Sequence, residues 1–127
     1  MKFIYSAQPD IFKNIDGSLR LLDNDNYVAR VGFYAKRDGV IDLAQDNSAV
    51  LHVDPSRRRE GLGKMICGKA ISQAITELKQ RGIQAKKVKA STTQLNIPAQ
   101  KLLESMGYVG VENSDPIDET IHYEFNL

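Results

Sequence analysis

The sequence predicts an α/β (α+β) fold, in which two main helices pack on a mixed, mostly antiparallel sheet of six to seven strands. Short segments of alternating apolar and polar residues, separated by turn residues, run from the N-terminus to Val53 and are typical of strands. Two segments with helical spacing of apolar residues follow, one on each side of a further strand-like segment. We therefore expect the strands at residues 49–53 and 87–91 to run parallel through a right-handed crossover.

The first half of the chain contains four predicted strands, which cover residues 2–6, 27–34, 40–43 and 49–53, and residues 18–22 could form a further strand. Clusters of Asp, Asn and Gly at residues 23–26 and 37–39 separate neighbouring strands and are typical of tight turns. Residues 7–17 are too few for two helices, so we expect one short helix or a turn there.

The second half begins with the strongest helix signal, at residues 62–81. Apolar side chains there recur at i, i+3 and i+4 and so share one face: Leu62, Met65, Ile66, Ala70, Ile71, Ala74, Ile75 and Leu78. Gly82, just beyond this segment, is typical of a helix C-terminus. The remaining predicted elements are, in chain order, strand 87–91, a helix from Pro98 to Gly107, strand 108–111, an acidic loop at 112–119 and strand 121–125.

The composition indicates one globular domain spanning residues 1–127. The formal net charge is only +1, so we do not expect nucleic acid as a partner. The single Cys67 excludes an intramolecular disulfide, and the two histidines leave too few ligands for a histidine-rich metal centre, so we expect no metal. No segment approaches the ~20 apolar residues of a membrane span, and no signal peptide is recognisable. We therefore expect a cytoplasmic protein.

The strongest functional signal is a basic, glycine-containing loop between the strand at 49–53 and the long helix. Gly61 and Gly63 lack the side chains that would keep a ligand away from the unpaired N–H groups of a helix's first turn, where the helix dipole is positive. Four cationic residues surround these glycines: Arg57, Arg58, Arg59 and Lys64. The loop therefore predicts a binding site for a phosphate or diphosphate.

Two common phosphate-binding fingerprints do not fit this loop. In the P-loop pattern, Arg58 would stand at the first glycine, and Met65 would replace the serine or threonine that follows the lysine. In the Rossmann pattern, Ile66 would stand at the third glycine. A nucleotide-binding domain of either class is therefore disfavoured.

Residues 53–63, Val-Asp-Pro-Ser-Arg-Arg-Arg-Glu-Gly-Leu-Gly, resemble the acyl-CoA-binding motif of the GNAT superfamily of N-acetyltransferases. Residues 96–108 resemble the second motif of that family, Asn-x-x-Ala-x-x-Leu-Tyr-x-x-x-Gly-Phe, and the two motifs stand in the family's order. The resemblance implies the acyl-CoA N-acyltransferase fold, with a V-shaped split in the sheet at the strand 49–53. It also implies direct transfer of an acetyl group from acetyl-CoA, as co-substrate, to an amine.

The resemblance also implies roles for individual residues. The N–H groups of the loop would hold the CoA diphosphate: Arg58, Arg59, Glu60, Gly61, Leu62, Gly63 and Lys64. Leu51 and Val53 would pair their main chain with the pantetheine arm, and the N–H of Val53 would bond the thioester carbonyl oxygen. Asn96 would contact the pantetheine from the other side of the split.

The sequence departs from the family pattern at two places. Leu103 stands where the family often has the tyrosine that protonates the departing sulfur, which leaves Tyr108 and Ser105 as substitute acids. Residues 7–17 cannot form the two helices that usually build one wall of the acceptor site. That wall is therefore reduced, or supplied by the second copy of a homodimer.

Neither a definite general base nor an acceptor follows from the sequence. Asp46 stands near the position where some relatives have a catalytic glutamate, although it also fits a turn. His52 neighbours Val53, but strand alternation places it on the opposite face. His122 and Glu124 share a face of the last strand and could border the acceptor site, whose ligand is a small-molecule or protein amine. The alternative function is a catalytically silent module of the same fold that binds CoA or a protein.

Overall fold

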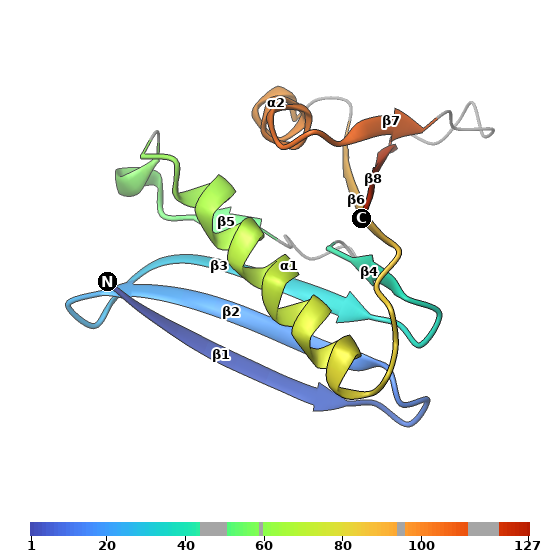
Figure 1. Ribbon diagram of the computed structural model, residues 1–127. Helices are drawn as coiled ribbons and strands as arrows, with labels where there is room; N and C mark the ends of the chain where they lie inside the picture. The colour runs from blue at the N-terminus through green and yellow to red at the C-terminus, as the bar shows by residue number, and fades with distance from the viewer. Residues whose placement is uncertain (44–50, 59, 94–95, 112–119) are drawn as a thin grey trace.

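The computed structural model describes residues 1–43, 51–58, 60–93, 96–111 and 120–127. Its elements are β1 (Lys2–Pro9), β2 (Ile15–Asp23), β3 (Asn26–Ala35), β4 (Val40–Asp42), β5 (Leu51–Val53), the 3₁₀ helix η1 (Pro55–Arg57), α1 (Leu62–Gln80), β6 (Lys87–Thr93), α2 (Ile97–Ser105), β7 (Val109–Val111) and β8 (Thr120–Asn126). The strands form one mixed sheet in the order β1-β2-β3-β4-β6-β8-β7, and β5 also pairs with β3 (Figure 1).

The predicted fold class is confirmed, with one correction to the number of strands. The sheet has eight strands rather than six to seven. The additional strand is β2, which forms at the segment 18–22 and pairs with both β1 and β3. Strand β4 pairs with Tyr34 and Ala35 of β3, and β5 pairs with Ala29, Arg30 and Val31.

Strands β1, β2 and β3 form an antiparallel meander, and α1 packs on one of its faces (Figure 1). Alternate residues of these strands are buried against the apolar stripe of the helix: Leu19, Leu21, Ala29, Val31 and Phe33. A turn joins β1 to β2, in which the Asp10 carboxylate accepts hydrogen bonds from the N–H groups of Phe12 and Asn14. Of the expected short helix or turn at residues 7–17, the structure has a turn at residues 10–14, whereas residues 7–9 and 15–17 belong to β1 and β2. No described helix covers the other face of the meander.

Helix α1 ends as its sequence predicts. Gly82 has φ +73°, and its N–H donates to the carbonyl oxygen of Lys79 at 3.0 Å. The N–H of Ile83 donates to the carbonyl oxygen of Leu78 at 2.9 Å. These two bonds satisfy carbonyl groups that a helix end otherwise leaves unpaired, and a left-handed residue is needed to form them. No helix in the described part of the chain is long and apolar enough to cross a membrane.

The sheet splits between β5 and β6. Strand β4 pairs parallel with β6 from Val40↔Lys87 to Asp42↔Lys89, and the N–H of Leu43 adds one more bond, to the carbonyl oxygen of Lys89. Beyond Lys89, β6 continues to Thr93 paired with β8 alone among the described strands. The parallel partner of β6 is therefore β4, and not the strand at 49–53 as expected, because β5 pairs only with β3. This separation is the predicted V-shaped split.

Candidate functional site

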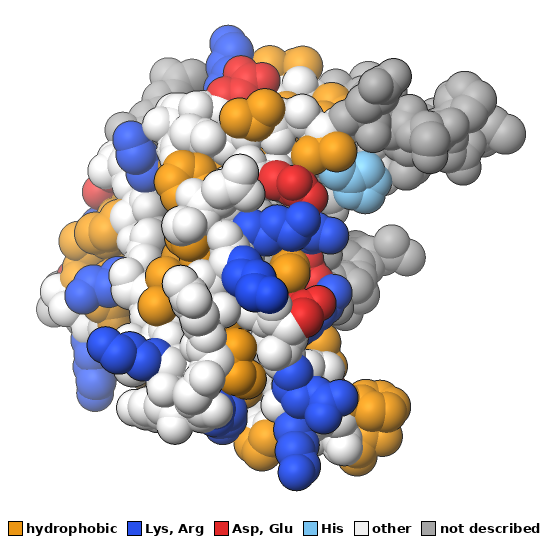
Figure 2. All heavy atoms as spheres, turned by 45° about the vertical axis from the view of Figure 1, so that its right-hand side comes forward, with side chains coloured by type: hydrophobic (Ala, Val, Ile, Leu, Met, Phe, Trp, Pro, Cys, Tyr) orange, Lys and Arg blue, Asp and Glu red, His pale blue; other side chains and the backbone are white. Residues whose placement is uncertain are grey.

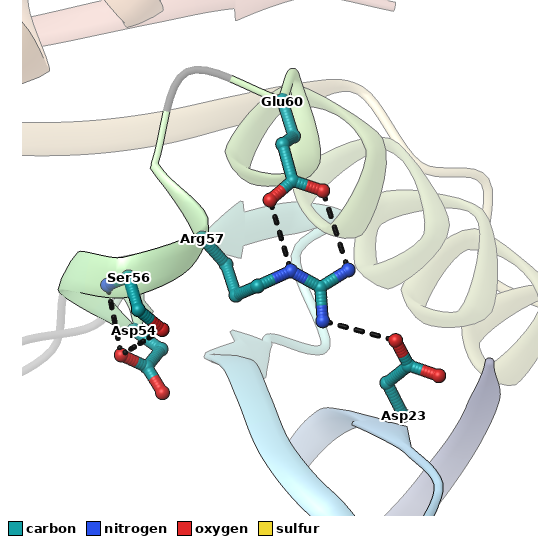
Figure 3. Close-up of polar contacts among 5 residues, drawn as sticks. All are labelled: Asp23, Asp54, Ser56, Arg57 and Glu60. Carbon is teal, nitrogen blue, oxygen red and sulfur yellow. Dashed lines mark hydrogen bonds and ion pairs between the residues drawn. The ribbon is translucent and has the colours of Figure 1, made fainter.

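The loop between β5 and α1 starts with a capped turn (Figure 3). The carboxylate of Asp54 accepts bonds from both the N–H and the hydroxyl of Ser56, each at 3.0 Å. These bonds, the N–H bond first, lower the pKa of Asp54 below its ordinary value. The capped turn reverses the chain at the end of β5, so that the following residues run towards the start of α1.

Arg57 holds this loop in place. Its guanidinium donates twice to the Glu60 carboxylate, at 2.9 and 3.2 Å, and once to Asp23 in the β2–β3 turn, at 3.0 Å (Figure 3). These bonds raise the pKa of Arg57, and the two-pronged geometry is specific for arginine. Arg57 is one of the four cations that the sequence places around the predicted phosphate site, but both carboxylates already occupy its guanidinium. The side chain of Glu60 is engaged in the same pair.

The first turn of α1 presents unpaired N–H groups. Gly61 is the N-cap, with φ +75°, and no side chain caps this end of the helix. The first bond of the helical ladder runs from the N–H of Met65 to the carbonyl oxygen of Gly61, at 3.1 Å. The N–H groups of Leu62, Gly63 and Lys64 precede this ladder, and no described residue accepts a hydrogen bond from them. A β-carbon at Gly61 would meet no atom within 4 Å, so the approach to these groups is open.

This first turn lies directly beside the split in the sheet. A β-carbon at Gly63 would lie 3.4 Å from Leu102 of α2, 3.6 Å from Leu51 and 3.8 Å from Val53. The first turn of α1, the strand β5 and the middle of α2 therefore meet at one place. Leu62 itself points into the core, 5% exposed, so only its main chain is available here.

The edge of β5 that faces the split presents main-chain N–H groups that do not pair with β3. The N–H of Asp54 donates to the carbonyl oxygen of Val28 at 2.7 Å, which makes Ala29↔Val53 a non-hydrogen-bonded pair. In such a pair, the N–H and C=O of both residues point away from the partner strand. The N–H of Val53, and by alternation that of Leu51, therefore points from β3 towards the split.

These features fit a diphosphate joined to an extended arm. The unpaired N–H groups and the positive end of the helix dipole favour an anion, and the exposed side chains of Arg58 and Lys64 add charge. Arg58 also lies against β5, with its Nε 3.5 Å from the carbonyl oxygen of Val53. Two predicted site residues, Arg59 and Asp46, lie outside the described residues.

A model of the GNAT acetyltransferase family matches residues 4–108. The chain belongs to the GNAT acetyltransferase family. No curated protein sequence matched the chain.

Solved GNAT-fold structures superpose on most of this GNAT chain. A Bacillus subtilis acetyltransferase in complex with CoA is 15% identical, with a TM-score of 0.66 over 88% of this chain and 77% of that one. A GNAT acetyltransferase from Streptococcus pneumoniae is 18% identical, with a TM-score of 0.63 over 88% and 67% of the two chains. The PaiA N-acetyltransferase of Thermoplasma acidophilum in complex with coenzyme A is 14% identical, with a TM-score of 0.67 over 87% and 60%. At these identities the likeness shows the shared fold.

The second GNAT motif forms α2 and the start of β7. Asn96 caps α2, and its side-chain oxygen accepts a bond from the N–H of Ala99 at 3.2 Å. Leu103, at the family's tyrosine position, is 8% exposed and packs in the core. Tyr108 is also buried, with its ring centroid 5.5 Å from that of Phe125. Its hydroxyl has no hydrogen-bond partner among the described residues, and burial raises the pKa of Tyr108 well above its ordinary range.

His52 lies on the face of β5 that points away from α1, as strand alternation predicts. Its Nδ1 is 2.6 Å from the hydroxyl of Tyr27, and the two rings stack with centroids 5.6 Å apart. No local sequence signal marks Tyr27, because its contact with His52 depends on how β3 pairs with β5. The described residues contain no group of three His, Cys, Asp or Glu side chains that could hold a metal ion.

Proposed function

We propose that this GNAT chain is an N-acetyltransferase that transfers an acetyl group from acetyl-CoA to an amine. The observation that carries the proposal is the position of the unpaired N–H groups of α1 directly beside the outward-facing main chain of β5. An anion-binding helix end next to a free strand edge suits a ligand with a diphosphate at one end and an amide-containing arm at the other. Family membership and the CoA complexes of two structural relatives support this.

Several residues would hold acetyl-CoA. The N–H groups from Arg58 to Lys64, including those of Arg59, Glu60, Gly61, Leu62 and Gly63, would bind the diphosphate. Leu51 and Val53 would pair with the pantetheine amides, and Asn96 would contact the arm from the α2 side. The N–H of Val53 would stabilise charge on the thioester oxygen as the amine attacks. When bound, acetyl-CoA supplies an acyl group on a thiol leaving group.

The amine must lose a proton before it attacks, and two residues are candidates for the base. Asp46 was predicted from its position in the sequence, before β5. His52 is the candidate that the described residues favour, because Tyr27 orients its ring on the face away from α1. If the Nδ1–H donates to the Tyr27 oxygen, Nε2 is left unprotonated and can accept the proton of the amine.

The departing sulfur needs little help from an acid. A thiol has a reference pKa of about 8.5, so its thiolate leaves readily at neutral pH. Tyr108 stays the candidate proton donor because no residue in the described part of the chain bonds its hydroxyl, but the raised pKa of Tyr108 disfavours proton donation. A cytoplasmic location and a homodimer that completes the acceptor wall remain part of the proposal.

Two measurements test the function. Isothermal titration with acetyl-CoA should show saturable binding that Gly61→Glu abolishes, because that side chain would fill the opening over the first turn of α1. Release of free thiol across a panel of amines should then exceed hydrolysis in the wild type, but not in Gly61→Glu. Binding without thiol release would favour the alternative, a catalytically silent CoA-binding module, whereas absence of binding at hundreds of micromolar would refute the proposal.

A further inference from the structure

A pocket lies where the split opens, on the face of the sheet away from α1. Its volume is about 390 Å³, and its lining includes Asp42, Lys89, Ser91, Val111, His122 and Glu124. Ile41 and Val88 are fully buried in the core, so the next residues along, Asp42 and Lys89, face the other way. The pocket is therefore bounded by the last residue of β4 and by the edge of β6 that has no described partner beyond Lys89.

Among the described charges of the pocket, Lys89 has no ion-pair partner. Asp42, Lys89 and Glu124 lie directly side by side in the register of β4, β6 and β8. Lys36 binds Asp42 at 2.8 Å, and Lys87 binds Glu124 at 3.3 Å. Lys89, between these two engaged carboxylates, forms no ion pair with any described residue, so its ammonium group is free to bind an anion. Figure 2 shows the basic and acidic side chains interleaved on this side of the molecule.

Two arginines on the same face of the sheet are positively charged, like Lys89. Arg20 and Arg30 are directly opposite each other on β2 and β3, and Arg30 is opposite His52 on β5. Arg30 shares its face of β3 with Tyr34, which is opposite Asp42. Like charges at opposed positions destabilise a sheet, and no described carboxylate pairs with either arginine. These two arginines therefore add positive charge to this face on the β3 side of the split.

We propose that the acceptor of the transferase proposed above is a small molecule that carries a carboxylate as well as its amine, as an amino acid does. Lys89 binds the carboxylate in the pocket, and the amine lies towards the split, where the thioester carbonyl would be. A volume of about 390 Å³ falls in the range of ~300–1,000 Å³ typical of small-molecule sites. A purely cationic amine is disfavoured, because Lys36 and Lys87 already neutralise the two carboxylates of the pocket.

The test compares amino acids with their amides, pair by pair, in the thiol-release assay. The two compounds of a pair differ only in that a carboxamide replaces the carboxylate. The amine of the amide is less basic, so more of it is unprotonated at neutral pH, and intrinsic reactivity alone would favour the amide. We expect kcat/KM to favour the best amino acid over its amide at least roughly tenfold, the effect of one charge-assisted hydrogen bond. Lys89→Gln should remove that preference by lowering kcat/KM for the acid alone, and Lys89→Arg should retain it.

A matched control and a binding measurement complete the design. Lys79→Gln removes the same charge from the exposed end of α1 and should leave the preference unchanged. If no acceptor releases thiol, titration of N-acetyl amino acids followed by NMR still reports on the pocket. Binding that Lys89→Gln abolishes would then support the carboxylate site while the transferase proposal fails. The inference would be overturned if the enzyme preferred the amide or putrescine, or if Lys89→Gln lowered kcat/KM equally for acid and amide. Absence of N-acetyl amino acid binding to the wild type would also overturn it.

Discussion

Comparing Gly61→Asp with Gly61→Asn separates the effect of a negative charge at the N-terminus of α1 from the effect of side-chain size. The two side chains have the same size, and both must adopt the left-handed backbone that Gly61 has at φ +75°. A β-carbon at this position meets no atom within 4 Å, so neither variant is obstructed. The comparison of Asp with Asn therefore isolates one negative charge beside the N–H groups of Leu62, Gly63 and Lys64.

The size of the effect follows from Coulomb's law. A carboxylate at position 61 would lie roughly 5 Å from a phosphate bound to those N–H groups, where repulsion costs about 1–3 kcal/mol for an effective dielectric constant between ~80 and ~20. Gly61→Asp should therefore bind CoA about 5- to 150-fold more weakly than Gly61→Asn. The same charge stabilises the helix dipole by about 0.3–1 kcal/mol, so Gly61→Asp should unfold at the higher temperature.

Titration calorimetry with CoA and thermal unfolding followed by circular dichroism measure these two opposite changes. The difference in CoA affinity should narrow at high salt, because ions screen exposed charges. Equal CoA affinities of the Asp and Asn variants, in a protein whose wild type binds CoA, would refute a diphosphate at this helix end. An Asp variant that is both less stable and weaker in binding would show that misfolding caused the loss.

Three further predictions concern the loop, the core and the pH dependence of stability. Arg57→Gln should lower the melting temperature, because it frees the loop from Asp23 and Glu60. Arg58→Gln should leave the melting temperature unchanged but weaken CoA binding, measured by calorimetry, roughly tenfold. Tyr108→Phe removes an unpartnered buried hydroxyl, so we expect about 1 kcal/mol of added stability in denaturant unfolding and unchanged thiol release, and a large loss of rate would instead identify Tyr108 as the acid. The Arg81 hydrogen bond holds the pKa of Glu77 below its ordinary 4.5. The ionised Glu77 therefore stabilises the folded protein above that pH, and this stabilisation is lost as the pH falls through the lowered pKa. Glu77→Gln should flatten this decline of the melting temperature on the acid side.

The elements of this fold could be predicted from sequence because the signals that define them are local. The apolar stripe of α1, Gly82 after it and Pro98 in the first turn of α2 each act within a few residues of the chain. The opening at the start of α1 was predictable for the same reason, because Gly61 lies next in the chain to the N–H groups that it leaves accessible. The sequence by itself thus determined which segments become helices and strands, and where a helix begins without a side-chain cap.

Only the tertiary structure decided which of the charged residues are free to bind a ligand. Arg57 and Arg58 are neighbours in a basic run, yet only Arg57 is within reach of Asp23, because the β2–β3 turn lies beside η1. Lys89 forms no ion pair with the residues that the structure describes, because its neighbours on β4 and β8 are already bound by Lys36 and Lys87. Such outcomes depend on the register between strands distant in the chain, and a shift of one residue would turn these side chains to the other face of the sheet.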